Sequence, residues 1–172
     1  MTLDAAGPAA ATRVAVIGVG NPYRRDDGVG RAVVTELAQN RLPGVSVAVL
    51  DGDPTQLLDA WEGMDVAVIV DAVRREPSCP GRIHRLVDPS GLHHQSDAGS
   101  THGLGVTDAI RLATALGRAP VRVVVYAVEA ADVGFGTGLT AAVAAAVPEV
   151  VAAVLAELRT IERSGTQPTD GE

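Results

Sequence analysis

Short apolar runs rich in β-branched residues alternate along this chain with longer segments of helical periodicity. Arg82–Val87 mixes apolar and polar residues, which predicts an edge strand. Strands that alternate with helices indicate an α/β fold. We therefore expect a three-layer α/β/α sandwich with a mainly parallel, about five-stranded mixed sheet. The runs typical of buried strands are Val14–Val19, Val45–Leu50, Val66–Val70 and Val121–Val128.

The helical segments are recognised by apolar residues that recur at spacings of three and four. Pro148 lies inside the last segment and predicts a kink or a split, because proline lacks the N–H that an interior helical turn requires. The predicted helices span residues 27–40, 54–61, 104–117 and 139–162.

Residues 13–162 are expected to form one domain. A chain of 172 residues is long enough for a single hydrophobic core, and no linker or repeat interrupts it. The ends, 1–12 and 163–172, are rich in Gly, Pro, Thr and acidic residues, which favour disorder. Segment 88–100 is polar and long enough to be a lid or a binding loop.

The composition argues against several classes of protein. A formal net charge of -7 does not suit a nucleic-acid-binding protein, which presents a basic face. Cys79 is the single cysteine, which excludes an internal disulfide and a multi-cysteine metal site. The first residues lack the basic and apolar regions of a secretory signal, and the most apolar stretch is interrupted by Pro148 and Glu149. We therefore expect a cytoplasmic protein without a membrane span.

The first strand runs into the sequence GVGNPYRRDD, residues 18–27. A dinucleotide-binding turn would need a third glycine where Tyr23 stands, and the two aspartates would repel phosphate. One Asp could cap the following helix by accepting hydrogen bonds from its free N–H groups. Capping accounts for only one of the two aspartates. The other could simply be a solvated carboxylate in the loop.

Two further aspartates end predicted strands, Asp51 and Asp71. Because the carboxyl ends of parallel strands form the ligand crevice of such sheets, Asp27 and Asp71 could face each other. A buried pair of carboxylates costs free energy or raises one pKa, and a metal ion would remove that cost. The alternatives are an Asp71 bonded to amides of a neighbouring loop, and an Asp51 that belongs to a turn or caps the helix after Pro54.

One of the four histidines stands out by its position. His102 directly precedes the predicted helix 104–117, where it could act as a ligand. The alternative is that it only belongs to the cap region of that helix. His84 is expected at the surface, and His93 and His94 are expected to be solvated in their polar loop. Two Asp and one His supply oxygen and nitrogen ligands that suit nickel or zinc, and spacing alone does not choose between them.

The segments VIGVGNPYRRDDGVG, VIVDAV and STHGLGVTDAIRLATALG together resemble the hydrogenase maturation proteases. These endopeptidases trim the C-terminal extension from the large subunit of nickel–iron hydrogenases. The similarity runs over residues 13–162, with the three motifs in order. It departs from the family at Ala130, where Pro is frequent, and at Thr140, where Ser is common.

The resemblance implies a phosphorylase/hydrolase-like sandwich and a set of site residues. Asp27, Asp71 and His102 would be both the catalytic residues and the nickel-recognition triad. Asp26 would serve the turn or the cap. Nickel would arrive already bound to the precursor of the hydrogenase large subunit, the expected partner of a monomeric enzyme that binds neither nucleic acid nor membrane.

The resemblance leaves the cleavage step open. Nickel could position the scissile peptide, act as a Lewis acid or activate water, or Asp27 or Asp71 could serve as general base. A Cys79 nucleophile is disfavoured because no base is evident beside it. Arg24 and Arg25 would lie at the rim of the crevice, where they meet acidic groups of the substrate or remain solvated. Other readings are a hydrolase with its own metal and a non-proteolytic nickel-binding assembly factor.

Overall fold

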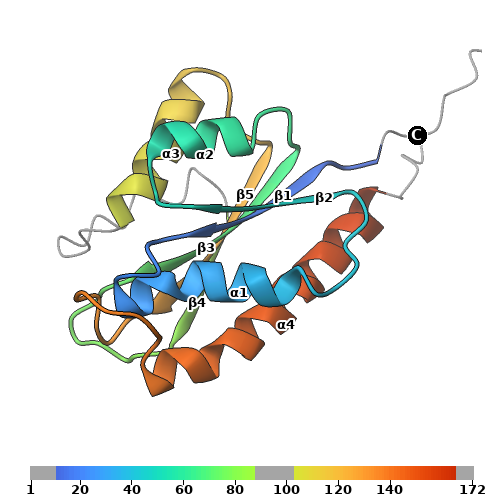
Figure 1. Ribbon diagram of the computed structural model, residues 1–172. Coiled ribbons are helices and arrows are strands. Elements are labelled where there is room, and N and C mark those ends of the chain that lie inside the picture. Colours follow the sequence, from blue (N-terminus) through green and yellow to red (C-terminus); the bar gives the residue numbers. More distant parts are fainter. Residues whose placement is uncertain (1–10, 88–102, 166–172) are drawn as a thin grey trace, which may run out of the picture.

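The five strands form one sheet, in the order β2-β1-β3-β5-β4 (Figure 1). The computed structural model describes residues 11–87 and 103–165. Four strands are parallel and β4 is antiparallel at one edge, so the predicted mixed sheet and its edge strand are confirmed. The strands are β1 (Val14–Val19), β2 (Val45–Leu50), β3 (Val66–Val73), β4 (Ile83–Val87) and β5 (Arg122–Glu129).

Helices cover both faces of the sheet, which confirms the three layers. In Figure 1, α2 and α3 lie on one face, and α1 and α4 lie on the other. Each helix falls within a segment predicted from periodicity, give or take a few residues, but a short 3-10 helix, η1 (Arg25–Gly28), precedes α1. The helices are α1 (Val29–Leu37), α2 (Pro54–Ala60), α3 (Gly103–Ala115) and α4 (Ala141–Gly165).

The central strands β1, β3 and β5 are buried on both sides, which explains their continuous apolar runs. Successive side chains of a strand point to opposite faces. Val68 of β3 therefore packs in the core on the α1 and α4 side, whereas Ile69 packs in the core on the α2 and α3 side. Asp71 follows Ile69 by two residues and points to the same face as Ile69.

α4 continues through Pro148 as one helix, so the predicted split is wrong. Pro148 cannot donate to the carbonyl of Ala144, four residues earlier. Both residues lie on the exposed side of α4, where water can hydrate the carbonyl. The missing hydrogen bond is thus tolerated at this position.

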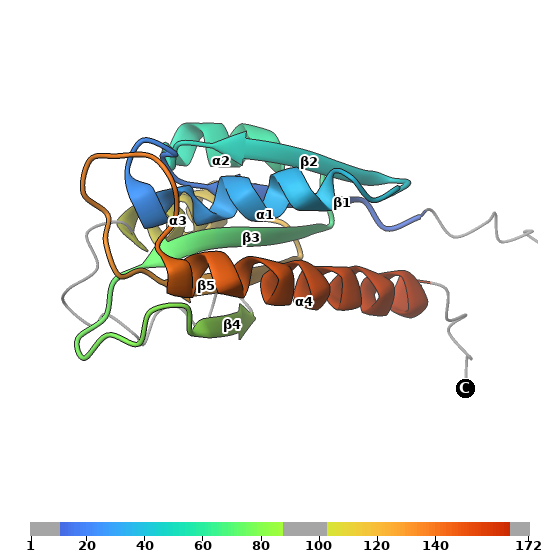
Figure 2. The same cartoon turned by 60° about the horizontal axis from the view of Figure 1, so that its bottom comes forward.

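By length and composition alone, Ala141–Ser164 could cross a membrane, with a mean hydropathy of 1.9. In this fold its apolar stripe packs in the core instead, beside α1 (Figure 2). The buried Glu157 on α4 accepts hydrogen bonds from Arg85 at 2.8 Å, Arg122 at 2.9 Å and Tyr126 at 3.1 Å. The bond from Arg85 holds the pKa of Glu157 below its ordinary value. These contacts are typical of a core helix in a globular domain, and α4 packs as such a helix.

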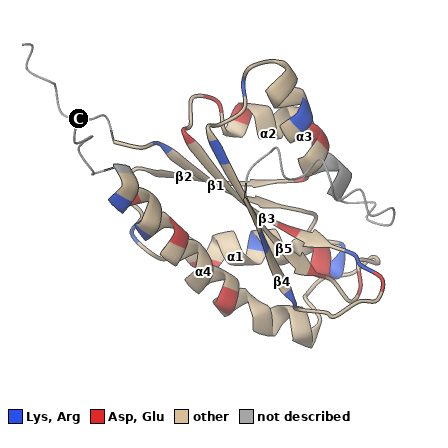
Figure 3. Cartoon of the chain, turned by 180° about the vertical axis from the view of Figure 1, so that it is seen from behind, with Lys and Arg blue, Asp and Glu red and all other residues tan. Residues whose placement is uncertain are grey.

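Acidic and basic residues are mixed over the described part of the molecule (Figure 3). Arg24 and Arg25 are followed by two aspartates, and Arg75 is followed by Glu76. Within residues 11–87 and 103–165, no element carries the continuous basic stripe that is typical of nucleic-acid-binding domains.

Two glycines bring α1 unusually close to the sheet. A Cβ at Gly30, in the first turn of α1, would clash with the carbonyl oxygens of Val19 and Val70. A Cβ at Gly18 would clash with the backbone of Gly30. The helix therefore begins directly on the carboxyl ends of β1 and β3, and this close packing positions the residues that precede it.

We expect Gly30→Ala to lower the free energy of unfolding by about 1–3 kcal/mol, because the added methyl meets backbone atoms that cannot move aside. Urea unfolding would measure the change. Thr35→Ala, at an exposed position of the same helix, is the matched control and should stay within about 0.5 kcal/mol of the parent. Equal stability of the two variants would contradict the close packing of α1.

Candidate active site

The sheet has a topological switch point between β1 and β3. The chain passes from β1 to β2 on one side and then returns to β3 on the other side of β1. In open α/β sheets, ligands bind outside the carboxyl ends of the strands at such a point. Asp27 follows β1 in η1, and Asp71 lies near the end of β3. β3 continues to Val73, two residues beyond Asp71, so the predicted end of this strand was too early.

Asp27 is held inside the loop that follows β1. Its side chain is buried, and the backbone N–H of Asn21 donates to Oδ2 at 2.8 Å. Gly20 has a φ of 127°, and a Cβ there would clash with the Asp27 carbonyl. The loop thus wraps tightly around Asp27 and fixes the position of its carboxylate.

Asp71 is buried in β3 and electrostatically coupled to Asp27. Its Oδ1 accepts a hydrogen bond from Ala72 N at 2.8 Å, so among the described residues this bond comes from its own strand. Burial raises the pKa of Asp71 well above its ordinary value, and the charge of Asp27 raises it further. The predicted pairing of the two carboxylates is thereby supported.

The Asp27–Asp71 pair is suited to receive a divalent cation. Two buried carboxylates of like charge destabilise each other, and a cation between them would remove this repulsion while gaining oxygen ligands. Among residues 11–87 and 103–165, no group of three His, Cys, Asp or Glu side chains gathers as a metal site. A metal would therefore need a ligand from elsewhere.

The histidine expected to complete the triad, His102, lies outside the described residues, as do His93 and His94. α3 begins at Gly103 and covers the face of the sheet toward which Asp71 points. The role of His102 stays a prediction.

Asp26 does not cap α1. The N-cap position of α1 is Gly28, without a side-chain hydrogen bond, because the η1 turn separates both aspartates from the helix start. The buried Asp26 carboxylate instead accepts from Ala131 N at 2.9 Å, Asp132 N at 3.0 Å, Thr140 N at 2.7 Å and Thr140 Oγ1 at 2.9 Å. Asp26 thus holds the loop between β5 and α4 against the loop that carries Asp27.

The two arginines of this loop bind the same β5–α4 loop. Arg24 Nε donates to the Val133 carbonyl at 3.1 Å, and Arg25 Nε lies 3.1 Å from Asp132 Oδ2. Arg25 has a φ of 48°, so its backbone is also turned to suit this contact. The alternative of purely solvated arginines is wrong, because both guanidinium groups tie the two loops together.

Another buried acid, Glu129, was not singled out by the sequence as a site residue. Its Oε1 lies 2.7 Å from His84 Nε2, and its Oε2 accepts from Cys79 N at 2.6 Å. Burial by itself would raise the pKa of Glu129, but these two hydrogen bonds outweigh it and lower the pKa. His84 is thus a half-buried partner of Glu129 and not the surface histidine that was expected. The sequence did contain an indication of this role, because Glu129 ends an apolar strand, as Asp51 does.

The remaining strand-end acid, Asp51, is part of a turn. It is exposed, and its Oδ1 accepts from Asp53 N at 3.1 Å. Asp53 caps α2 by accepting from Thr55 N at 2.8 Å. The turn prediction for Asp51 is confirmed, and the cap of α2 belongs to its neighbour two residues later.

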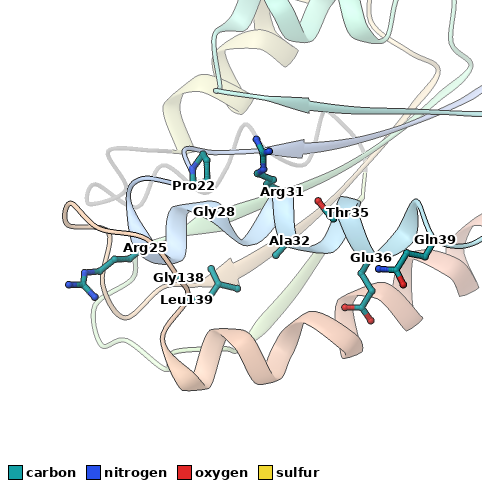
Figure 4. A pocket seen from close by; sticks show the side chains of 10 residues that line it. All are labelled: Pro22, Arg25, Gly28, Arg31, Ala32, Thr35, Glu36, Gln39, Gly138 and Leu139. Carbon is teal, nitrogen blue, oxygen red and sulfur yellow. The ribbon is translucent and has the colours of Figure 1, made fainter.

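A shallow groove of about 520 Å³ follows the outer side of α1 (Figure 4). Its side chains point in different directions from the helix and do not converge on one place. Neither Asp27 nor Asp71 lines it, so the groove is separate from the carboxylate pair. It is lined by Pro22, Arg25, Gly28, Arg31, Ala32, Thr35, Glu36, Gln39, Gly138 and Leu139.

Comparison with known proteins points to one family. The family model described as "Hydrogenase maturation protease" matches residues 31–157. The hydrogenase 2 maturation protease of Escherichia coli K12 is 29% identical over 149 residues, which cover 86% of this chain and 91% of that protein.

Solved structures of similar proteins share the fold. The hydrogenase maturating endopeptidase HybD from Escherichia coli superposes with a TM-score of 0.74 at 28% identity, covering 87% of this chain and 93% of that one. The nickel–iron hydrogenase maturation protease HybD from Thermococcus kodakarensis gives a TM-score of 0.72 at 25% identity, covering 86% and 99%.

We expect Asp26→Asn to lower the free energy of unfolding by about 2–3 kcal/mol, because an amide NH₂ would face backbone N–H groups that need an acceptor. Urea unfolding at neutral pH would measure the loss. Asp132→Asn is the matched control. It weakens an exposed ion pair, leaves an oxygen for the N–H of Gly134, and should cost less than about 1 kcal/mol.

We expect Asp71→Asn to stabilise the protein at neutral pH. The raised pKa means that the native state binds a proton at Asp71 more tightly than the unfolded state does, so stability falls as pH rises above the ordinary Asp value of about 3.9. Asparagine removes this penalty and keeps an oxygen for Ala72 N. The gain should be present at pH 8 and vanish below about pH 4 in urea unfolding. A variant that is less stable than the parent at pH 8 would contradict the coupled pair.

Proposed function

This chain belongs to the hydrogenase maturation protease family and is a hydrolase of the endopeptidase class, and from this premise we propose that it removes the C-terminal extension of a nickel–iron hydrogenase large-subunit precursor after nickel has been inserted. The observation that carries the proposal is the buried Asp27–Asp71 pair at the carboxyl edge of the sheet. We further propose that the enzyme acts as a monomer in the cytoplasm, where an exposed thiol such as that of Cys79 remains reduced.

The pair provides a way to distinguish loaded from empty precursor. The two carboxylates repel each other in the free enzyme, and a nickel ion carried by the substrate would neutralise that repulsion. A precursor without nickel offers no such gain, so recognition becomes a metal-dependent difference in affinity. His102, implied by the family resemblance, would add the nitrogen ligand that the described residues lack.

The chemistry that follows is hydrolysis of one peptide bond. Nickel held in the precursor would supply Lewis-acid polarisation of the scissile carbonyl. Asp71 is the better candidate for handling the proton, because its raised pKa brings it closer to neutral pH than an ordinary carboxylate. It would take a proton from the attacking water and return one to the leaving amine, while Asp27, whose Oδ2 accepts a hydrogen bond from Asn21 N, would supply an oxygen ligand to the cation.

The test is processing of purified precursor, with and without nickel, followed by mass measurement. We expect the loaded precursor to lose its C-terminal segment and the empty precursor to remain intact. Asp27→Asn, Asp71→Asn and His102→Ala should each slow processing by at least about 100-fold. Asp51→Asn, an exposed aspartate that follows the neighbouring strand, is the matched control and should retain the parental rate.

The possible results separate the alternatives. Processing by Asp71→Asn at the parental rate would contradict the role of the carboxylate pair. Cleavage of the empty precursor would contradict nickel recognition. Binding of the loaded precursor without any loss of mass would favour a non-proteolytic assembly factor.

A further inference from the structure

Tyr23, Arg24 and Phe135 form a patch of side chains at the carboxyl edge of the sheet, which we name the aromatic rim. Tyr23 is 69% exposed and Phe135 is 90% exposed. The chain contains one Trp, two Tyr and one Phe, and the other two aromatic residues, Trp61 and Tyr126, are buried. A protein with so few rings thus leaves half of them in water, and both belong to loops that are hydrogen-bonded to each other.

The backbone under the aromatic rim is firmly held. Gly136 N donates to the Tyr23 carbonyl at 2.9 Å, and Arg25 N donates to the Gly136 carbonyl at 3.0 Å. The four hydrogen bonds to Asp26 fix the same two loops from beneath. The exposure of the rings is therefore a property of a fixed surface. Rigid aromatic side chains lose little conformational entropy on binding and are frequent in the energetic centres of interfaces.

The arginine of the aromatic rim belongs to the same surface. The guanidinium carbon of Arg24 lies 5.9 Å from the centroid of the Phe135 ring, and Arg24 Nε is held by the Val133 carbonyl at 3.1 Å. This arrangement orients the ring without covering it. Tyr23 precedes Arg24 in the same loop, and aromatic residues and arginine are enriched at protein–protein interfaces.

The aromatic rim lies on the loops that form the candidate site. Tyr23 and Arg24 stand between Gly20 and Asp27, in the loop that wraps around the Asp27 carboxylate. A folded substrate that brings its cleavage site to the Asp27–Asp71 pair has to cover this loop as well. Because the aromatic rim lies beside the candidate site, the substrate of that site is the partner that we expect to contact the rim.

We propose that the aromatic rim is a docking surface for apolar side chains of the folded hydrogenase large-subunit precursor, next to its cleavage site. The inference rests on the proposed function, because it assigns the rim to the same substrate. The rim would contribute to affinity for the folded precursor, whereas the Asp27–Asp71 pair contributes nickel recognition and chemistry.

Steady-state processing of nickel-loaded precursor tests the proposal with the variants Tyr23→Ala and Phe135→Ala. We expect KM to rise at least about tenfold in each variant, with kcat within about twofold of the parent, because the rings act in binding and touch no reacting atom. Phe135→Trp should retain a KM near the parental value. Leu116→Ala and Val121→Ala are the controls, since both residues are exposed but lie at the opposite, amino edge of β5.

The outcomes are distinguishable. If the parent protein does not process the precursor, the proposed function fails. If the parent processes it and both rim variants keep the parental KM, only the docking proposal is overturned. If sedimentation shows that the parent is a dimer and the rim variants are monomers, the occupant is a second copy of this chain, which also overturns the proposal. Unchanged urea unfolding of the variants would confirm that a rise in KM does not reflect a damaged fold.

Discussion

Four hydrogen bonds to one carboxylate, that of Asp26, hold the functional edge of this molecule together. The donors come from both ends of the loop between β5 and α4, and the carboxylate comes from the loop after β1. Asp26 is fully buried, so its charge is stabilised by these donors and not by water. The start of α4, the aromatic rim and the loop around Asp27 all depend on this connection.

Adjacent aspartates thus have opposite environments within one loop. Asp26 has its acceptor capacity filled by donors of the protein, which makes it a structural anchor. Asp27 faces the buried Asp71, whose pKa is raised by burial and by the charge of Asp27. Asp26 is thus surrounded by hydrogen-bond donors, whereas Asp27 lies close enough to a second buried carboxylate for the two like charges to oppose each other. This difference explains why the chain places two acids side by side where the first strand meets its helix, and it links stability and function through one short segment.

Backbone contacts and buried acids hold this edge of the sheet rigid. Local rigidity comes from backbone contacts, such as those of Gly30 with the ends of β1 and β3. Another buried acid, Glu129, binds His84 of β4 and the backbone N–H of Cys79, which precedes β4. Both loops are therefore held in place by groups of the protein itself.

Sequence patterns alone were enough to predict the strands and helices to within a few residues and to place Asp27 and Asp71 at one edge of the sheet. Strand and helix periods are local patterns, and parallel strands bring their carboxyl ends to one edge, so strand-end acids can be placed without coordinates. Two features became visible only in the folded chain: the role of Asp26, whose partners lie more than 100 residues away, and the pairing of His84 with Glu129, 45 residues apart. Such hydrogen bonds leave no periodic trace in the chain, because they depend on which loops the fold brings together.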